Sequence, residues 1–310
     1  MPTEHPLAPS SISDVERDTG VAKETLRVWE RRYAFPQPLR DAQGERLYPA
    51  EQVAKLRLVK RLMDLGHRPG KMMPHSAAHL QELAALTRKT EQRQPDPELQ
   101  LYMTLCKTHQ IDALREHLLQ AQQAMGTKRF VIDVIAPLTT QVGAAWADGE
   151  LAVFGEHLYT EAAQAVLRMV IFSTLQQGAD LARPRILLTT LPQERHGLGL
   201  LMAEALCVAE GAHCISLGVQ TPLQDIVEAS RTQRADIIAL SFSSAMNPRQ
   251  AKEGLNALRA ALPASTQLWA GGSCSTLGKR LPAQVRVLTL DQIGFHLAEW
   301  RSQQQTGASD

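Results

Sequence analysis

The chain has 310 residues, a length that suits two or three domains of ordinary size. Hydrophobic residues make up 44% of it and charged residues 21%, which is typical of a soluble globular protein and excludes a long disordered chain. The formal net charge is +1. Residues 11–80, however, hold 13 Lys and Arg against 9 Asp and Glu, so a weakly basic front end precedes a slightly acidic remainder.

The apolar stretches and the cysteines indicate the cellular compartment of the protein. No uninterrupted apolar stretch reaches the roughly 18 residues that span a bilayer, and residues 1–10 lack the basic and apolar regions of a signal peptide. The cysteines are scattered and form no CxxC pair. They are Cys106, Cys207, Cys214 and Cys274. We therefore expect a cytoplasmic protein without membrane insertion.

Two polar breaks divide the chain into three blocks. The first, residues 88–97, is charged and ends in two prolines, and the second, residues 176–180, precedes a long apolar run. These breaks predict three domains, at residues 1–88, 96–180 and 183–305. The sequence contains no internal repeat.

The first block begins with two short helical segments. Ser13 and Glu16 have the spacing of a capping box, which predicts that a helix begins at Ser13. Gly20 ends this helix, and residues 23–32 read as a second one. A glycine-containing turn between two short helices is typical of a helix-turn-helix.

The rest of the first block predicts a hairpin and a longer helix. Two prolines exclude a helix directly after residue 35, and residues 40–48, with Gly44 in the middle, suit a small hairpin. Leu26 and Trp29 of the preceding helix are expected to face inward. Apolar residues then return at helical spacing. They are Val53, Leu56, Val59, Leu62 and Met63.

Residues 21–33, followed by Pro36, Arg40 and residues 44–48, resemble the winged-helix DNA-binding domain of MerR-type transcription regulators. The resemblance covers roughly residues 11–80. It is specific, because the turn, the recognition helix and the wing occur in order at the family's spacing. Other MerR-type proteins sense metals with cysteines. The first 100 residues of this chain contain none, so the signal is expected to come from elsewhere.

The resemblance implies a set of DNA-binding residues. Thr25 and Arg27 of the recognition helix would approach the major groove, and Arg46 and Tyr48 of the wing would touch the DNA backbone. Guanidinium groups suit these roles because they pair with phosphates and with guanine edges. The whole implied set is Thr25, Arg27, Arg31, Arg40, Arg46 and Tyr48. The alternative is that the arginines of this helix form only a solvated face.

The second and third blocks predict different architectures. Residues 96–177 have almost no strand pattern and four helical stretches, which predicts a four-helix bundle. The third block alternates apolar runs with amphipathic stretches, which predicts a Rossmann-like (flavodoxin-like) parallel sheet with ligands at the carboxyl ends of its strands. The runs are Ile186–Leu191, His213–Leu217, Ile237–Phe242, Gln267–Ala270 and Val285–Leu288. The expected fold class is therefore multidomain α and α/β.

Polar residues and glycines follow three of these predicted strands. In chain order they are Glu194, His196, Gly199, Ser241, Ser243, Gly271 and Gly272. This ordered set resembles the cobalamin-binding domain of methionine synthase and related proteins, whose pattern is Asp-x-His-x-x-Gly, Ser-x-Leu and Gly-Gly. The resemblance implies that all seven residues bind cobalamin in its base-off form. It also implies that His196 is the lower axial ligand of cobalt.

The chemistry of an axial histidine explains the acidic residue of the motif. A neutral imidazole suits a borderline metal ion, and its other ring nitrogen needs an acidic partner that fixes its tautomer. Glu194 stands where the family usually has Asp, and Ser243 replaces the family's Leu with a more polar side chain. Without the resemblance, a lone His at the end of a strand is most often an ordinary polar loop residue.

In the second block, Trp146 is followed after nine residues by Glu156-His157. This spacing resembles the cap of the light-sensing, adenosylcobalamin-dependent MerR-type repressors of the CarH and LitR kind. There, the Trp packs over the upper face of the corrin and the Glu and His lie beside the 5′-deoxyadenosyl group. The alternative is core packing for the Trp and a solvated acid. In the light-sensing members a His follows this Trp and can ligate cobalt after photolysis, whereas here the residue is Ala147.

These resemblances imply a repressor that binds adenosylcobalamin and double-stranded operator DNA. It would self-associate as a dimer or tetramer in the dark and release or rearrange on DNA when light breaks the cobalt–carbon bond. We expect no enzymatic turnover. One alternative is a MerR-type regulator that binds cobalamin or another tetrapyrrole without sensing light. Another is a corrinoid methyl carrier, which has no evident use for a winged helix.

Overall fold

The computed structural model describes residues 9–64, 67–89, 96–176, 182–278, 281–282 and 284–307. It divides into two compact units, one of Met1–Pro97 with Val142–Val153 and one of Glu98–Gln141 with Phe154–Asp310. The breaks predicted at 88–97 and 176–180 fall largely outside the described residues. The division into three domains therefore remains a prediction.

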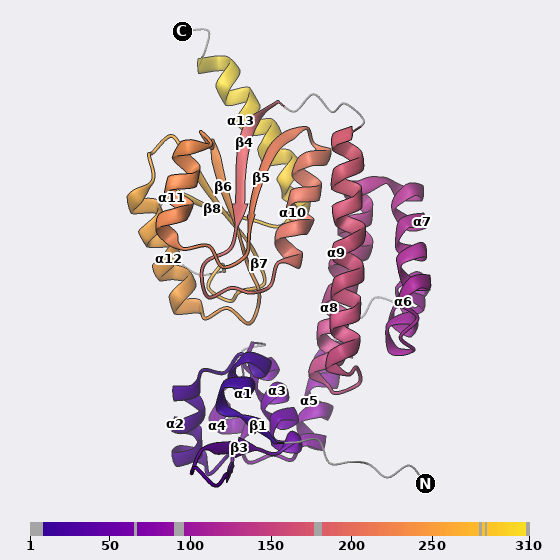
Figure 1. The fold of residues 1–310 in the computed structure, drawn as a ribbon, viewed down its shortest axis with the longest axis vertical. Helices are drawn as coiled ribbons and strands as arrows, with labels where there is room; N and C mark the ends of the chain where they lie inside the picture. Colours follow the sequence, from indigo (N-terminus) through magenta and orange to yellow (C-terminus); the bar gives the residue numbers. More distant parts are fainter. Residues whose placement is uncertain are drawn as a thin grey trace. The chain divides into compact units, whose positions relative to one another are not determined.

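The first unit is a small antiparallel sheet surrounded by short helices (Figure 1). Its strands are β1 (Ser10–Ser11), β2 (Leu39–Arg40) and β3 (Arg46–Tyr48), in the order β1-β3-β2. Its helices are α1 (Ile12–Thr19), α2 (Lys23–Tyr33), α3 (Ala50–Asp64), α4 (Pro69–Met72) and α5 (Ala77–Lys89). Arg40 pairs with Arg46 across β2 and β3, which confirms the predicted hairpin.

The start of α1 differs from the prediction. Ser11, not Ser13, caps the helix, because the Ser11 hydroxyl accepts the backbone N–H of Asp14 at 3.2 Å. Ser11 lies in β1 opposite Leu47, so the chain leaves the sheet and enters the helix at this residue. The predicted box at Ser13 is therefore wrong. Glu16 instead accepts the backbone N–H of Lys23 at 3.1 Å and joins α1 to the start of α2.

The core of the first unit follows the apolar pattern of the sequence. Leu26 and Trp29 of α2 are buried at 0% and 4% exposure, as predicted, and they belong to one cluster with the buried face of α3. Gly20 has φ of 68° at the end of α1. This left-handed conformation suits glycine and produces the turn between the two helices of the helix-turn-helix.

The second unit contains a set of long helices. They are α6 (Pro97–Lys107), α7 (Ile111–Arg129), the π-helical segment η1 (Phe130–Ile135), the first half of α8 (Ala136–Ala147) and α9 (Val153–Gln176). The second half of α8, from Val142, belongs to the first unit. The helical path is interrupted at Gly126 within α7, because this residue has non-helical φ and ψ. The stretch Ile111–Ala147 is long and apolar enough to cross a membrane by length and composition alone, a test that the core helix of a soluble bundle also passes. Several of its side chains are fully buried, including Leu114, Leu118 and Phe130.

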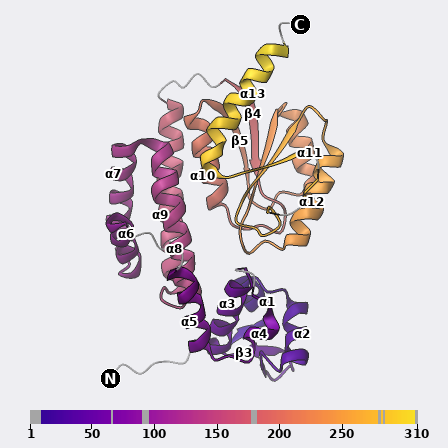
Figure 2. The ribbon, with the colours of Figure 1, turned by 180° about the vertical axis from the view of Figure 1, so that it is seen from behind.

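The C-terminal part of the second unit is a five-stranded parallel sheet (Figures 1 and 2). The strands are β4 (Ala182–Thr189), β5 (Ala212–Gly218), β6 (Ile237–Phe242), β7 (Gln267–Gly272) and β8 (Val285–Leu288), in the order β5-β4-β6-β7-β8. These strands confirm the five predicted runs. Residues in the middle of β4 and β6, such as Ile186 and Ile238, are completely buried, which explains why the runs are continuously apolar.

Helices cover both faces of this sheet, as the figures show. They are α10 (Leu198–Ala209), α11 (Leu223–Thr232), α12 (Pro248–Ala261) and α13 (Ile293–Gly307), the last preceded by the 3-10 turn η2 (Leu290–Gln292). Helices α10 and α13 lie on one face, and α11 and α12 lie on the other. From β4 the chain adds β5 on one side of the sheet and then β6, β7 and β8 on the other, so the strand order switches between β4 and β6. In open sheets of this flavodoxin-like type, ligands bind at such a switch point.

Candidate functional site

Three polar segments meet at the carboxyl edge of the sheet. β4 and β6 are neighbours, and so are β6 and β7, where Ser241 pairs with Gly271 and Phe242 with Gly272. The loop after β4 contains Glu194 and His196, and Ser243 follows β6. The predicted cobalamin residues of the sheet therefore come from three adjacent strands.

Glu194 and His196 form a hydrogen-bonded pair. The Glu194 side chain is 1% exposed, whereas His196 is 62% exposed. One carboxylate oxygen of Glu194 lies 2.6 Å from Nδ1 of His196 and accepts the backbone N–H of His196 at 2.9 Å. Among the described residues, Nε2 of His196 has no hydrogen-bond partner. The imidazole is thus held at one nitrogen and presents the other, as an axial metal ligand requires.

Ser243 supports the same carboxylate. Its backbone N–H donates to Glu194 at 2.8 Å, and its hydroxyl lies 2.8 Å from the same oxygen and 3.0 Å from Nδ1 of His196. The replacement of the family's Leu by Ser243 therefore adds a partner for Glu194. Sequence spacing could not reveal this contact, because it joins residues that are 49 positions apart.

Thr190 is a further residue of this site that the motifs do not include. It is completely buried, its hydroxyl donates to the backbone carbonyl of Glu194 at 2.8 Å, and it accepts the backbone N–H of Gln220 at 2.8 Å. Thr190 thereby ties the loop after β4 to the loop after β5. Its position directly after a buried strand was the only sequence signal for this role.

The charges of the pair shift the pKa values of both groups. The hydrogen bond to Glu194 raises the pKa of His196, against the opposing effect of burial. Burial by itself raises the pKa of the Glu194 carboxyl, but the hydrogen bonds from His196 and Ser243 outweigh burial and lower this pKa. The pair therefore favours an ionised carboxylate in the ordinary pH range.

Glycines permit close packing at the carboxyl edge. A Cβ atom on Gly199 would lie 2.7 Å from the Ser241 hydroxyl, and one on Gly271 would lie 3.1 Å from the carbonyl oxygen of Leu288. Gly272 has φ of 113°, and a Cβ there would lie 2.1 Å from the Phe242 carbonyl oxygen. No side chain fits at Gly272 without backbone movement, so the local packing requires glycine at this position.

A cavity of about 320 Å³ adjoins this edge within the second unit. Gly272 lines it together with residues that follow β8, and Ile132 and Ala136 line it from the helices. The complete lining is Ile132, Ala136, Gly272, Leu288, Thr289, Leu290 and Asp291. Gly272 is the one residue of this lining that the motifs include.

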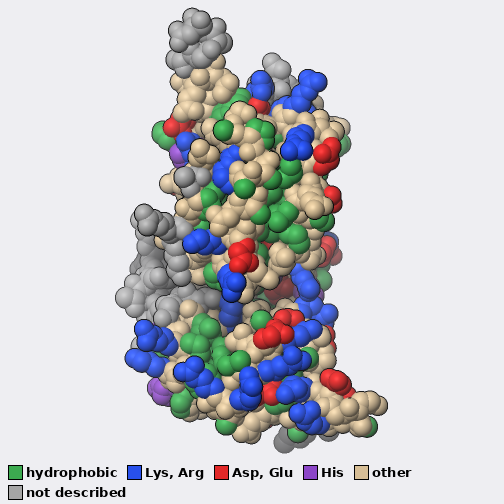
Figure 3. Space-filling view, turned by 90° about the vertical axis from the view of Figure 1, so that its left-hand side faces the viewer, with side chains coloured by type: hydrophobic (Ala, Val, Ile, Leu, Met, Phe, Trp, Pro, Cys, Tyr) green, Lys and Arg blue, Asp and Glu red, His purple; other side chains and the backbone are tan. Residues whose placement is uncertain are grey.

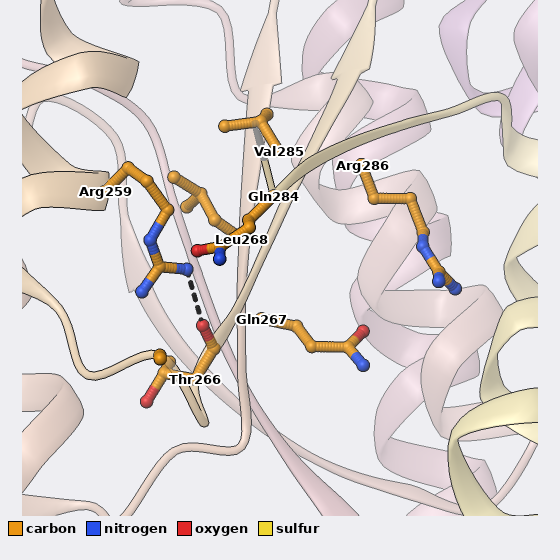
Figure 4. Close-up of a pocket in the computed structure, with 8 residues that line it drawn as sticks. Arg259, Thr266, Gln267, Leu268, Gln284, Val285 and Arg286 are labelled. Atoms are coloured by element: carbon orange, nitrogen blue, oxygen red, sulfur yellow. Dashed lines mark hydrogen bonds between the residues drawn. The ribbon is translucent and has the colours of Figure 1, made fainter. Parts of the chain in front are cut away.

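A second hollow, of about 390 Å³, lies at the start of β7 and β8, the edge opposite to His196 (Figure 4). Arg259 projects into it but donates to the backbone carbonyl of Thr266 at 2.7 Å. Arg286 lies on its rim and is bonded to His296 and Glu299. Both arginines are thus occupied by protein groups, and the hollow contains none of the predicted cobalamin residues.

Glu156 and His157 lie at the start of α9 in the second unit. Glu156 accepts the Thr160 hydroxyl at 2.7 Å, and His157 is 71% exposed. The Glu156 carboxylate contributes to the raised pKa of His196, so these two groups lie within electrostatic range of each other. The structure thus brings one predicted cap residue and the predicted axial ligand to the same region.

Trp146 belongs to the first unit, at the end of α8. Its ring lies 5.0 Å from the Arg57 guanidinium of α3, and its buried Nε1 has no hydrogen-bond partner among the described residues. Next to it, Asp148 forms an ion pair with Arg61. A role of Trp146 over a corrin therefore remains a prediction, and the contact with Arg57 is one that the sequence did not indicate.

The winged helix presents most of its predicted DNA-binding residues to solvent. Arg27, Arg31 and Arg40 are exposed, and Thr25 is partly exposed. The Arg40 guanidinium donates to the Gly44 carbonyl across the hairpin at 2.5 Å. Figure 3 views this unit from the side of α2 and shows many Lys and Arg side chains on that face. Such a basic face suits a phosphate backbone.

Tyr48 differs from the other predicted DNA contacts. Its side chain is completely buried, and its hydroxyl donates to Glu30 at 2.8 Å. Burial, followed by the hydrogen bond to Glu30, raises the pKa of Tyr48 well above its ordinary value. In this structure Tyr48 belongs to the core beneath the wing. Arg46 is half-buried and pairs with the same Glu30.

The fold and the site together define a helix-turn-helix regulator that carries a B12-binding domain. The family model described as MerR HTH family regulatory protein matches residues 10–71. Two models described as B12 binding domain match residues 105–171 and 184–295.

Two curated relatives identify the family of the whole chain. It is 31% identical over 262 residues to the HTH-type transcriptional repressor CarH of Myxococcus xanthus, which covers 83% of this chain and 86% of that protein. It is 30% identical over 258 residues to the repressor CarA of the same organism, covering 81% and 83%. The chain therefore belongs to the family of B12-binding, MerR-type transcriptional repressors that includes CarH and CarA.

A solved structure supports the fold of the second unit. The monomethylamine corrinoid protein of Methanosarcina barkeri matches with a TM-score of 0.52 and 13% identity, over 64% of this chain and 96% of that chain. The likeness shows a common fold of helices and parallel sheet.

Proposed function

We propose that the chain is a light-responsive transcriptional repressor that binds adenosylcobalamin and operator DNA. The observation that supports cofactor binding best is the group of Glu194, His196 and Ser243 at the carboxyl edge of the sheet. Glu194 and Ser243 hold Nδ1 of the imidazole, and Nε2 remains available for a metal. The glycines at the same edge, Gly199, Gly271 and Gly272, are positions where a Cβ would press on neighbouring protein atoms, as expected of a motif set by close packing.

His196 would be the lower axial ligand in base-off binding, and Glu194 would fix its tautomer and basicity. Gly199, Ser241 and the Gly271-Gly272 pair would border the slot for the nucleotide tail. Glu156, His157 and Trp146 would cap the upper face. When bound, adenosylcobalamin supplies a cobalt–carbon bond that light can break. No residue of this group needs to turn over a substrate, so we infer that the protein is not an enzyme.

The response to light would rest on the cap. A bound adenosyl group would keep Trp146 away from the metal, and loss of that group would let the helices shift and an oligomer interface change. Ala147 cannot ligate cobalt, so the illuminated state lacks the bond that an adjacent His would supply. We therefore infer an incomplete or more readily reversed change in assembly. The protein would work in the cytoplasm, as a dimer or tetramer in the dark.

Absorption spectra and size-exclusion chromatography test this proposal directly. The full chain is mixed with adenosylcobalamin in darkness and measured before and after green illumination, with methylcobalamin and hydroxocobalamin as controls. DNA binding is measured on a duplex that the full chain itself selects from a random-sequence pool. We expect the illuminated protein to change its assembly and its affinity for this duplex. Identical assembly and affinity in every state would contradict light sensing.

A regulator that binds a corrinoid without sensing light is the second candidate, and Ala147 favours it. The same experiment separates the two candidates. Cobalamin binding that depends on His196, without a difference between dark and light, would establish the second candidate. Substitution of His196 by Ala should weaken cobalamin binding and change the spectrum. An unchanged affinity and spectrum would remove His196 as the axial ligand.

A further inference from the structure

Glu30 joins the recognition helix α2 to the wing. Its two carboxylate oxygens accept Nε of Arg46 at 3.1 and 3.0 Å, and one of them also accepts the Tyr48 hydroxyl at 2.8 Å. The Glu30 side chain is only 15% exposed and that of Arg46 is 27% exposed. These are hydrogen bonds between residues 16 and 18 positions apart, so they fix the two elements relative to each other.

The contact uses only one edge of the Arg46 guanidinium. Glu30 accepts from Nε, and the two terminal nitrogens of Arg46 have no hydrogen-bond partner among the described residues. A guanidinium carries five N–H donors, of which the four on the terminal nitrogens can pair with a phosphate. Glu30 therefore restricts how Arg46 is oriented without occupying the donors that an anion would use.

Tyr48 fixes the carboxylate from the other side. The Tyr48 ring is completely buried in the core of the first unit, so its hydroxyl has a fixed position. A carboxylate bonded both to this hydroxyl and to Arg46 has little freedom to rotate. The three side chains thus form a rigid connection from the unit's core to the wing surface.

We propose that Glu30 is a positioning residue for DNA binding, which holds the wing at a set angle to the recognition helix and directs the terminal nitrogens of Arg46 toward a DNA phosphate. The inference rests on the DNA binding assigned above to the winged helix. It gives a functional part to a mostly buried acidic residue of the recognition helix.

Charge and positioning predict opposite effects when Glu30 is removed. Loss of one negative charge from a DNA-binding surface, by itself, strengthens binding to the phosphate backbone. Loss of a positioning contact releases Arg46 and weakens binding. The sign of the change therefore distinguishes the two roles.

The test compares Glu30→Ala and Glu30→Gln with the wild-type full chain, on the duplex that wild-type protein selects from a random pool and on a scrambled duplex. We expect Glu30→Ala to weaken binding to the selected duplex by roughly tenfold, the equivalent of one hydrogen bond to a charged group. Glu30→Gln keeps one acceptor and the shape of the side chain, so its loss should be smaller. Thermal unfolding shows whether each variant is folded.

Glu24→Ala is the matched control, because Glu24 lies on the same helix, is 78% exposed and forms its ion pair, a loose one of 3.9 Å, with Arg27 of that helix and not with the wing. It removes the same charge and should not weaken binding. A double-mutant cycle with Arg46→Ala gives the second readout. If Glu30 acts through Arg46, the Glu30→Ala variant should lose no further affinity once Arg46 is absent.

Unchanged or tighter DNA binding by folded Glu30→Ala protein would overturn the proposal. The proposal would also fail if Glu30→Ala weakened DNA binding as much in the Arg46→Ala background as in the wild-type background. These outcomes leave DNA binding itself intact. If the wild-type chain selects no duplex at all, the DNA-binding function fails, and the role of Glu30 fails with it.

Discussion

Replacement of Glu194 by Gln tests whether the Glu194 carboxylate orients His196 for cofactor binding. The carboxylate receives hydrogen bonds from the His196 ring, the His196 backbone and Ser243. In glutamine, one of the two oxygens becomes an NH₂ donor. At least one of these N–H groups would then face another donor, while the volume of the side chain stays the same.

The expected loss follows from these contacts. Outer-shell partners of a metal-binding His typically contribute 10- to 100-fold to affinity. This corresponds to about 1.4–2.8 kcal/mol, the range of one hydrogen bond to a charged group. We therefore expect Glu194→Gln to weaken adenosylcobalamin binding by about 10- to 100-fold near pH 8, less than or equal to the loss in His196→Ala.

The pH dependence provides an independent readout with a defined sign. Coordination requires a neutral imidazole, so binding weakens as the pH falls through the pKa of His196. The hydrogen bond to Glu194 raises this pKa, so in wild-type protein the loss begins at a higher pH than for an ordinary histidine. Glu194→Gln removes the anion and should move the midpoint to lower pH, while it also lowers the affinity above the midpoint.

The assay is a spectroscopic titration in darkness at several pH values. Glu204→Gln is a suitable control, because Glu204 is a partly buried glutamate on α10 of the same domain and its hydrogen-bond partner is Ser216, not His196. Glu194→Asp restores the residue of the related cobalamin motif and should retain most of the affinity. An unaltered affinity together with an unaltered pH midpoint in Glu194→Gln would refute the reasoning.

Three further predictions concern packing and DNA contact. Gly199→Ala should lower the melting temperature and weaken cobalamin binding, because the new Cβ would lie 2.7 Å from the Ser241 hydroxyl. If this contact is the cause, the double variant Gly199→Ala with Ser241→Gly should regain the wild-type melting temperature. Gly272→Ala should lower the free energy of unfolding, measured with denaturant, by more than about 2 kcal/mol. Gly44 also has a positive φ, but no atom lies within 4 Å of an added Cβ, so Gly44→Ala should lower the free energy of unfolding by about 1 kcal/mol. Equal losses at the two glycines would mean that backbone conformation alone matters. Arg27→Ala should weaken binding to the selected duplex and give a shallower dependence of affinity on salt, by about one counterion, and an unchanged slope would exclude a phosphate contact.

The order of elements could be read from the sequence because it depends on local patterns. Continuous apolar runs predicted all five strands, since strands buried on both faces must be apolar at every position. Leu26 and Trp29 were predicted to be buried because helical spacing places them on one face of α2. The pair Glu194 and His196 was implied by the resemblance to the cobalamin motif, and the structure places the two side chains 2.6 Å apart.

Long-range contacts were decided only by the tertiary structure. Ser243 departs from the family's Leu, and its contact with Glu194 arises only because β4 and β6 are neighbours in the sheet. Tyr48 looked like a surface residue of the wing, but it lies in the core, because burial depends on what packs against a strand and not on the strand's own sequence. The cap of α1 moved from Ser13 to Ser11 for the same reason, since the sheet partner Leu47 fixes where the helix begins.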